Sequence, residues 1–173
     1  MASPVKYQDS RRVTKTERDE HGGPEAGPWQ RLLAMTVLSF ASMYVLMYAM
    51  VYQWPHVLGN YNQVYMAGLM TAPMVVIELA LMGHMLSPPA LRAAVAGVAL
   101  VAAVLFWFAI RDQMAIGNAQ FLRSMIPHHS GAILMCRNSR LTDPEIIALC
   151  KQITDSQQRE IDTMQAILRR ISG

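Results

Sequence analysis

Long apolar segments alternate with short polar breaks over the first two thirds of this chain. Three segments consist almost entirely of apolar residues: 32–52, 64–86 and 91–110. Each segment is long enough to cross about 30 Å of hydrocarbon as a helix. Trp54-Pro55 interrupts the pattern after the first segment, and Ser87-Pro88-Pro89 interrupts it after the second. The pattern therefore predicts a three-helix transmembrane region over residues 31–111.

The two ends of the chain follow other patterns. Residues 1–30 are polar and mixed in charge, so we expect them to form a disordered tail. In residues 112–173, apolar side chains recur at three- and four-residue intervals, which is typical of amphipathic helices. A turn near residue 141 precedes Pro144 and Glu145, a combination that starts helices. The expected fold class is all-α: three transmembrane helices followed by a helical hairpin.

Composition and charge narrow the class of protein. Hydrophobic residues make up 53% of the 173 residues and charged residues only 16%, whereas soluble domains carry about a quarter of charged residues. The net charge of +3 gives little support to a nucleic-acid partner. The chain has no glycine-rich phosphate loop, no nucleophile elbow and no His-Glu-x-x-His motif. We therefore expect a membrane protein that is not an enzyme.

Positive charges near the ends of the apolar segments predict the orientation in the membrane. On one side of the predicted membrane lie Lys15, Arg18, Arg31 and Arg92, and on the other side lie Arg111 and Arg123. Because cytoplasmic loops carry the excess of Lys and Arg, we expect the tail to be cytoplasmic. Three crossings then make the hairpin at 112–173 extracytoplasmic, in the periplasm or the extracellular space.

One cluster of side chains in the hairpin suggests metal chemistry. Residues spaced three or four apart share a helix face, and two such faces meet across the hairpin: Met125, His128 and His129 on the first helix, and Gln157, Glu160 and Met164 on the second. Imidazole and thioether together are typical ligands of copper, above all of Cu(I), whereas zinc has little use for a thioether. The alternative is that the histidines brace the hairpin while the methionines fill its core.

Three motifs in this region resemble the DUF305 family. They are Met125-Ile126-Pro127-His128-His129, Asp143-Pro144-Glu145, and Gln157 followed by Glu160-Ile161 and Met164. The resemblance covers residues 112–170. It implies a bacterial, ferritin-like helical domain from a family whose members are linked to copper binding and tolerance, and which includes a membrane-anchored branch. It also implies metal contacts at Met125, His128, His129 and Met164.

The expected function is therefore copper handling or tolerance by a protein of the bacterial inner (plasma) membrane that binds a copper ion, Cu(I) or Cu(II). The expected ligands are Met125, His128, His129, Glu160 and Met164. The alternative is a membrane interaction or scaffold protein whose hairpin docks a partner and has no metal role.

The two cysteines admit three interpretations. Cys136 and Cys150 lie nearly opposite each other across the expected hairpin. They form a disulfide if the compartment is oxidising, they act as thiolate ligands of copper, or they are small buried residues without further role.

Methionine is unusually frequent, with 14 residues, and several methionines share faces of the predicted spans. In the second span, one arc contains Met66, Met70, Met74, Glu78, His84 and Met85. A glutamate within a span is costly unless it faces a partner or a cavity. This arc is either a path of soft ligands for Cu(I) or a set of lipid-compatible side chains, and we favour the second interpretation.

The hairpin alone is small for a stable core, so we expect it to be covered by another element. A homodimer through residues 112–173 would complete a four-helix bundle, which is the arrangement that the family resemblance implies. The alternative is a hairpin that folds back on the outer ends of its own spans.

Overall fold

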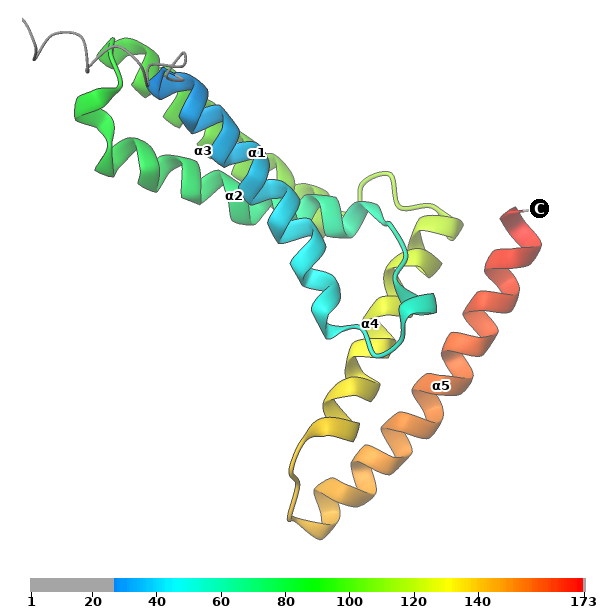
Figure 1. Cartoon of the computed structure of the whole chain (residues 1–173). Helices are drawn as coiled ribbons and strands as arrows, with labels where there is room; N and C mark the ends of the chain where they lie inside the picture. Colours follow the sequence, from blue (N-terminus) through cyan, green and yellow to red (C-terminus); the bar gives the residue numbers. More distant parts are fainter. Residues whose placement is uncertain (1–26, 173) are drawn as a thin grey trace, which may run out of the picture.

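The computed structural model describes residues 27–172, and every regular element within them is a helix (Figure 1). The elements in this range are α1 (Pro28–Leu46), η1 (Met47–Met50), η2 (Trp54–His56), α2 (Tyr61–Leu81), η3 (Gly83–Met85), α3 (Pro89–Arg111), α4 (Asn118–Asn138) and α5 (Pro144–Ser172). The all-α prediction is confirmed for these residues. The predicted disordered tail lies, up to residue 26, outside the described residues.

Local signals explain where the three apolar helices begin. α1 begins at Pro28, a few residues before the predicted boundary, because proline suits the first helical turn, where no N–H is needed. α2 begins at Tyr61 because the Asn60 side chain caps it, accepting a hydrogen bond of 2.9 Å from the Gln63 amide. α3 begins at Pro89 for the same reason as α1.

The three apolar helices pack side by side, with α2 in contact with both α1 and α3 (Figure 1). The three candidate spans are Pro28–Met50, Tyr61–Leu81 and Pro89–Arg111; their most apolar 18 residues have mean hydropathies of 1.8, 1.8 and 2.5, and each span is long and apolar enough to cross a membrane. Most of their apolar surface is not covered by the chain itself: Leu33 of α1 is 65% exposed and Val98 of α3 is 69% exposed. An apolar surface of this extent is typical of a face that meets lipid.

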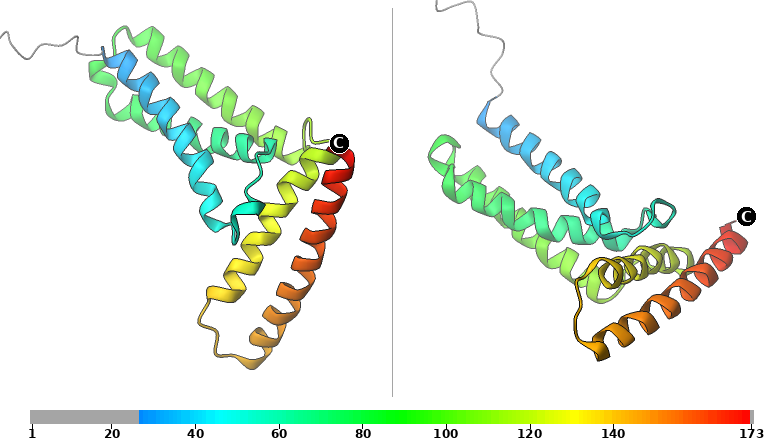
Figure 2. Two further views of the ribbon diagram at one scale, coloured as in Figure 1. Left: turned by 45° about the vertical axis from the view of Figure 1, so that its right-hand side comes forward. Right: turned by 60° about the horizontal axis from the view of Figure 1, so that its bottom comes forward.

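A tight turn separates α3 from α4, so the two helices are not continuous. Gln113 and Ala115 have φ angles of 48° and 58°, in the left-handed region that a right-handed helix cannot contain. The Tyr65 hydroxyl of α2 donates a hydrogen bond of 2.9 Å to the Met114 carbonyl and holds this turn. α4 and α5 therefore form a second arm that leaves the three apolar helices at an angle (Figure 2).

α4 and α5 lie side by side and run in opposite directions (Figures 1 and 2). Ile126, Ile133 and Ile161 are fully buried between them. Tyr52 and Leu58, from the connection between α1 and α2, pack against the same isoleucines. The chain thus covers this core with its own α1–α2 connection, as in the fold-back alternative, and the homodimer stays a prediction.

A disulfide between Cys136 and Cys150 joins the far ends of α4 and α5. Of the three interpretations of these cysteines, the structure therefore has the disulfide. Because both sulfurs are bonded to each other, neither is a thiolate ligand.

The contact between α2 and α3 yields a stability prediction. A Cβ added to Gly68 of α2 would lie 2.4 Å from the Phe106 ring of α3, whereas a Cβ added to Gly97 of α3 meets no atom within 4 Å. Both glycines lie inside helices, so Gly→Ala brings the same gain in helix propensity at each. We expect Gly68→Ala to be less stable than Gly97→Ala by about 1–3 kcal/mol, the usual cost of overpacking.

The measurement is denaturant unfolding of the full chain in detergent micelles, followed by circular dichroism. Gly97→Ala serves as the matched control, and equal unfolding free energies of the two variants would contradict the α2–α3 contact.

Candidate metal centre

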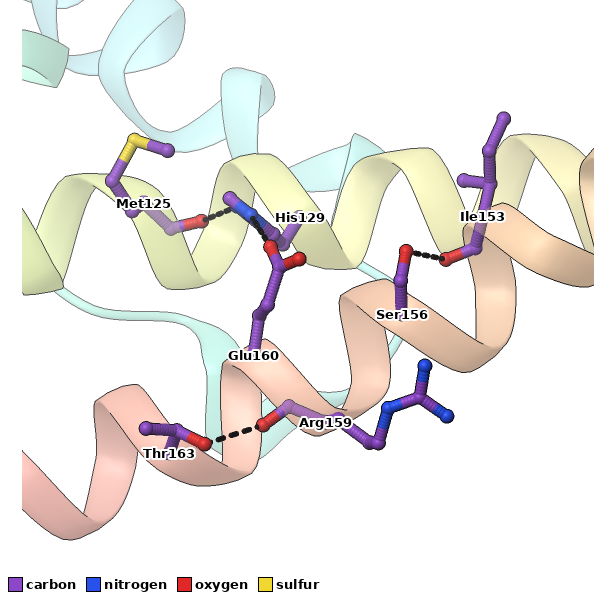
Figure 3. Close-up of polar contacts among 7 residues, drawn as sticks. All are labelled: Met125, His129, Ile153, Ser156, Arg159, Glu160 and Thr163. Atoms are coloured by element: carbon purple, nitrogen blue, oxygen red, sulfur yellow. Dashed lines mark hydrogen bonds and ion pairs between the residues drawn. The ribbon is translucent and has the colours of Figure 1, made fainter.

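A histidine of α4 and a glutamate of α5 face each other across the seam between the two helices (Figure 3). The His129 Nε2 atom lies 2.7 Å from the Glu160 Oε2 atom. The His129 side chain is 10% exposed, whereas the Glu160 side chain is 52% exposed. The His129 side chain is therefore held in the helix interface, whereas the Glu160 side chain reaches solvent.

The other ring nitrogen of His129 is held by the backbone. Its Nδ1 atom lies 2.9 Å from the Met125 carbonyl oxygen, one helical turn earlier (Figure 3). A carbonyl only accepts hydrogen bonds, so Nδ1 carries the hydrogen and donates it. Nε2 lies 2.7 Å from the Glu160 carboxylate, which also accepts, so these two atoms share a proton, and a metal ion would bind Nε2 by replacing that proton. Histidine ligands of metals commonly have this arrangement, with the second ring nitrogen donating to a carbonyl.

Four of the five predicted site residues line one groove between α4 and α5: Met125, His129, Glu160 and Met164. The two methionines differ in their surroundings. Met164 also packs against the buried isoleucines. Figure 3 shows the Met125 carbonyl directed at His129 while its sulfur lies away from the Glu160 carboxylate.

His128, the fifth predicted residue, does not line this groove. It is exposed, and its ring centroid lies 6.0 Å from that of His129. Successive residues of a helix point about 100° apart, so only one of two adjacent histidines can face α5 directly. Gln157 is half-buried and is also not among the residues that line the groove.

The donor atoms of the groove fit copper better than zinc. Within residues 27–172 no group of three or more His, Cys, Asp or Glu side chains is placed to hold a metal, and the cysteines are paired in the disulfide. The groove instead offers one imidazole, one carboxylate and two thioethers. Thioethers are soft ligands that suit Cu(I), while imidazole and carboxylate also suit Cu(II).

A second histidine, which sequence reasoning did not single out, lies on the other flank of the seam. His56 of η2 is 3% exposed, and its Nδ1 atom lies 2.9 Å from the Ser130 hydroxyl of α4. The same hydroxyl accepts a hydrogen bond of 2.9 Å from the Tyr52 amide, so its hydrogen is free for His56. The residue follows Trp54-Pro55 in a loop without periodicity, and no sequence signal marks it as buried.

Two further contacts fix the α1–α2 connection on α4. Pro127 has no N–H, so the Arg123 carbonyl one turn earlier lacks its helical donor, and the Asn60 side chain approaches that carbonyl at 3.4 Å instead. Arg137 donates a hydrogen bond of 2.9 Å to the Tyr52 hydroxyl and stacks over its ring at 4.9 Å. The helix that carries His129 is therefore positioned by a loop distant in sequence.

Comparisons with known proteins agree with this division of the chain. Residues 110–169 match the family model described as Domain of unknown function (DUF305). The chain is also 33% identical over 144 residues to an uncharacterized protein of Acanthamoeba polyphaga mimivirus, in an alignment covering 79% of this chain and 90% of that protein. No solved structure matches the chain. The family model spans the two helices that line the groove, and the alignment with the viral protein extends into the apolar helices.

The buried His56 predicts a pH dependence of stability. Burial lowers the pKa of His56, and the charge of Asp162 opposes this shift in part. Because the folded state disfavours the charged ring, the unfolded state binds more protons once the pH falls below the ordinary histidine value of about 6.5. Stability should therefore be fully present above that pH and decline as the pH falls below it.

Thermal unfolding of the full chain between about pH 7.5 and pH 5 tests this expectation. His56→Gln should lose less stability on acidification than the wild type does. His128→Gln, at an exposed position, should behave like the wild type. An identical pH dependence for the wild type and His56→Gln would contradict the assignment.

Proposed function

This chain belongs to the DUF305 family, and we propose that it is a membrane-anchored member that binds copper in copper handling or tolerance. The observation that carries the proposal is the chain of contacts from the Met125 carbonyl through the His129 ring to the Glu160 carboxylate. These contacts hold His129 Nε2 beside a carboxylate in a groove that Met125 and Met164 also line. The copper association that the family resemblance implies agrees with this donor set.

In this proposal the residues of α4 and α5 have distinct roles. His129 Nε2 and Glu160 Oε2 both bind the ion, which replaces the proton of their 2.7 Å hydrogen bond, and the Met125 carbonyl keeps the ring in the orientation that binds. The thioethers of Met125 and Met164 add soft donors that favour Cu(I) over harder ions, once the Met125 side chain turns its sulfur toward the Glu160 carboxylate. His128 is an outer ligand, which has to turn toward the groove to reach the same ion.

The placement of the protein in a membrane is part of the same proposal. Three apolar helices that leave most of their surface uncovered support a multi-pass protein. The Lys and Arg distribution favours a cytoplasmic N-terminus, and the disulfide favours an oxidising compartment for α4 and α5, such as a bacterial periplasm or the extracellular space. Both signals agree on the same orientation in the inner or plasma membrane.

The proposed assembly is a homodimer through α4 and α5. Ile146, Ile147 and Leu149, near the start of α5, are between 47% and 53% exposed. A second copy could cover them in a four-helix arrangement about a two-fold axis. Ile161 is fully buried within the chain, so the surface available for such a contact is the beginning of α5 and not its centre. The same exposed patch favours the alternative function, in which this end docks a partner protein without a metal role.

Copper affinity of variants tests the proposed ligands. Since loss of even an outer partner of a metal ligand costs about 10–100-fold in affinity, His129→Ala and Glu160→Gln should each weaken copper binding by at least that much. His128→Ala should have a smaller effect. The measurement is competition of the full chain in detergent micelles with a chromophoric Cu(I) chelator.

The neighbouring histidines make this a controlled comparison, because the two substitutions remove the same side chain from adjacent positions. Undiminished copper affinity in folded His129→Ala and Glu160→Gln would overturn the proposed site. A larger loss in His128→Ala than in His129→Ala would move the site to the exposed face of α4.

The orientation has its own test. A reporter enzyme that is active only outside the cytoplasm should function when fused after Gly173, since three crossings separate this end from the N-terminus. The same reporter fused before Met1 should be inactive. Activity in the reverse pair would place α4 and α5 in the cytoplasm.

A further inference from the structure

A pocket of about 370 Å³ lies where α1 begins and α2 ends, at the ends of the apolar helices far from α4 and α5 (Figure 1). Three methionines and one glutamate line it: Met35 from α1, Glu78 from α2, Met82 after α2 and Met85 from η3. None of these methionines lines the groove around His129. We propose that this pocket is a second metal site, which binds a soft monovalent cation of the Cu(I) or Ag(I) class through three thioethers and the Glu78 carboxylate.

Ligand chemistry favours this class of ion. Thioether sulfur is a soft neutral donor, and soft donors select Cu(I) over the hard and borderline ions. Arg31 lines the same pocket as Glu78, so the lining contains one basic and one acidic side chain. A monovalent ion then adds a single positive charge to the pocket, whereas a divalent ion adds two in a region of low dielectric.

Glu78 is the acidic ligand of the proposed site. It is half-buried, and it is the one Asp, Glu, Lys or Arg in the sequence between Arg31 and Arg92. An ionisable residue within a membrane helix is costly, and it usually marks an ion or substrate site. The Glu78 carbonyl accepts a hydrogen bond of 2.8 Å from the Met82 amide. Glu78 and Met82 therefore lie one helical turn apart on the same side of α2.

The end of the molecule that holds the pocket is braced rather than loose. The Trp29 indole of α1 donates a hydrogen bond of 2.9 Å to the Ser87 carbonyl, which ties the start of α1 to the turn before α3. Arg92 of α3 donates to the Gly83 carbonyl in η3, the segment that carries Met85. Leu32 and Leu86, which also line the pocket, are 7% and 4% exposed and belong to one apolar cluster. The donor residues thus come from three segments whose relative positions are fixed.

The chain supplies a matched set of methionines for comparison. Met66, Met70 and Met74 of α2 are 39%, 43% and 40% exposed, similar to the 46%, 41% and 50% of Met35, Met82 and Met85. They do not line the pocket. A general affinity of exposed membrane methionines for soft ions would involve both sets equally, whereas the proposed site involves only Met35, Met82 and Met85.

The experiment counts Ag(I) ions bound to the full chain in detergent micelles. We start from the His129→Ala variant, in which the proposed metal site between α4 and α5 is impaired. The result then does not depend on whether that first site binds metal. In this background, one tight equivalent of Ag(I) is expected. Adding Met35→Leu, Met82→Leu and Met85→Leu should remove it, while adding Met66→Leu, Met70→Leu and Met74→Leu should leave it.

Leucine is close to methionine in volume, so these substitutions should be tolerated, and circular dichroism verifies the helices. If the triple variant does not fold, the single variants Glu78→Gln and Met82→Leu are measured in its place. Each should weaken Ag(I) at least about tenfold, as loss of a partner at a metal site does. Absence of Ag(I) binding in the His129→Ala background, or equal loss from both methionine sets, would overturn the proposal.

Discussion

The Ser130 hydroxyl of α4 holds the connection between α1 and α2 against the second arm, and much of the molecule depends on this contact. It accepts a hydrogen bond from the Tyr52 amide and bonds to the His56 ring, both at 2.9 Å, and the Ser130 and His56 side chains are both buried. Leaving any of these polar groups unpaired in the interior would be costly. The loop therefore cannot move unless other hydrogen bonds replace those it loses. Because Ser130 directly follows His129, the same helical turn that anchors the loop also presents the imidazole to Glu160.

This arrangement gives the seam between α4 and α5 two unlike flanks. On one flank Ile161 is buried under Tyr52 and Leu58 of the α1–α2 connection, and His56 has no access to solvent. On the other flank Glu160 remains half-exposed beside His129. Neighbouring positions on α5 thus differ completely in their environment. The half-exposed Glu160 keeps the groove accessible to solvent, and the core beside it is covered by Tyr52 and Leu58 of the α1–α2 connection.

The sequence predicted the parts of this structure that depend on local pattern. The helices follow from apolar periodicity, and the start of α5 follows from the turn before Pro144 and Glu145. Antiparallel helices around a turn near residue 141 also bring the face that carries His129 toward the face that carries Glu160. The position of the α1–α2 connection could not be predicted, because its contacts join residues 74 and 78 positions apart. Nor could spacing alone decide between His128 and His129. That choice depends on how α4 rotates about its axis, and the rotation is set by the loop and the buried isoleucines.

The disulfide at the far end of α4 and α5 has a consequence for the integrity of the chain. It closes a ring over the segment between Cys136 and Cys150, which contains the exposed linker before Pro144. A protease that cuts within this ring opens the loop but releases nothing, because the sulfur bridge still joins the two helices. The nicked protein would keep His129 and Glu160 on one covalent molecule and leave α5 attached to the apolar arm. Cleavage that separates the pair has to occur inside a helix, where the backbone is hydrogen-bonded and resists proteolysis.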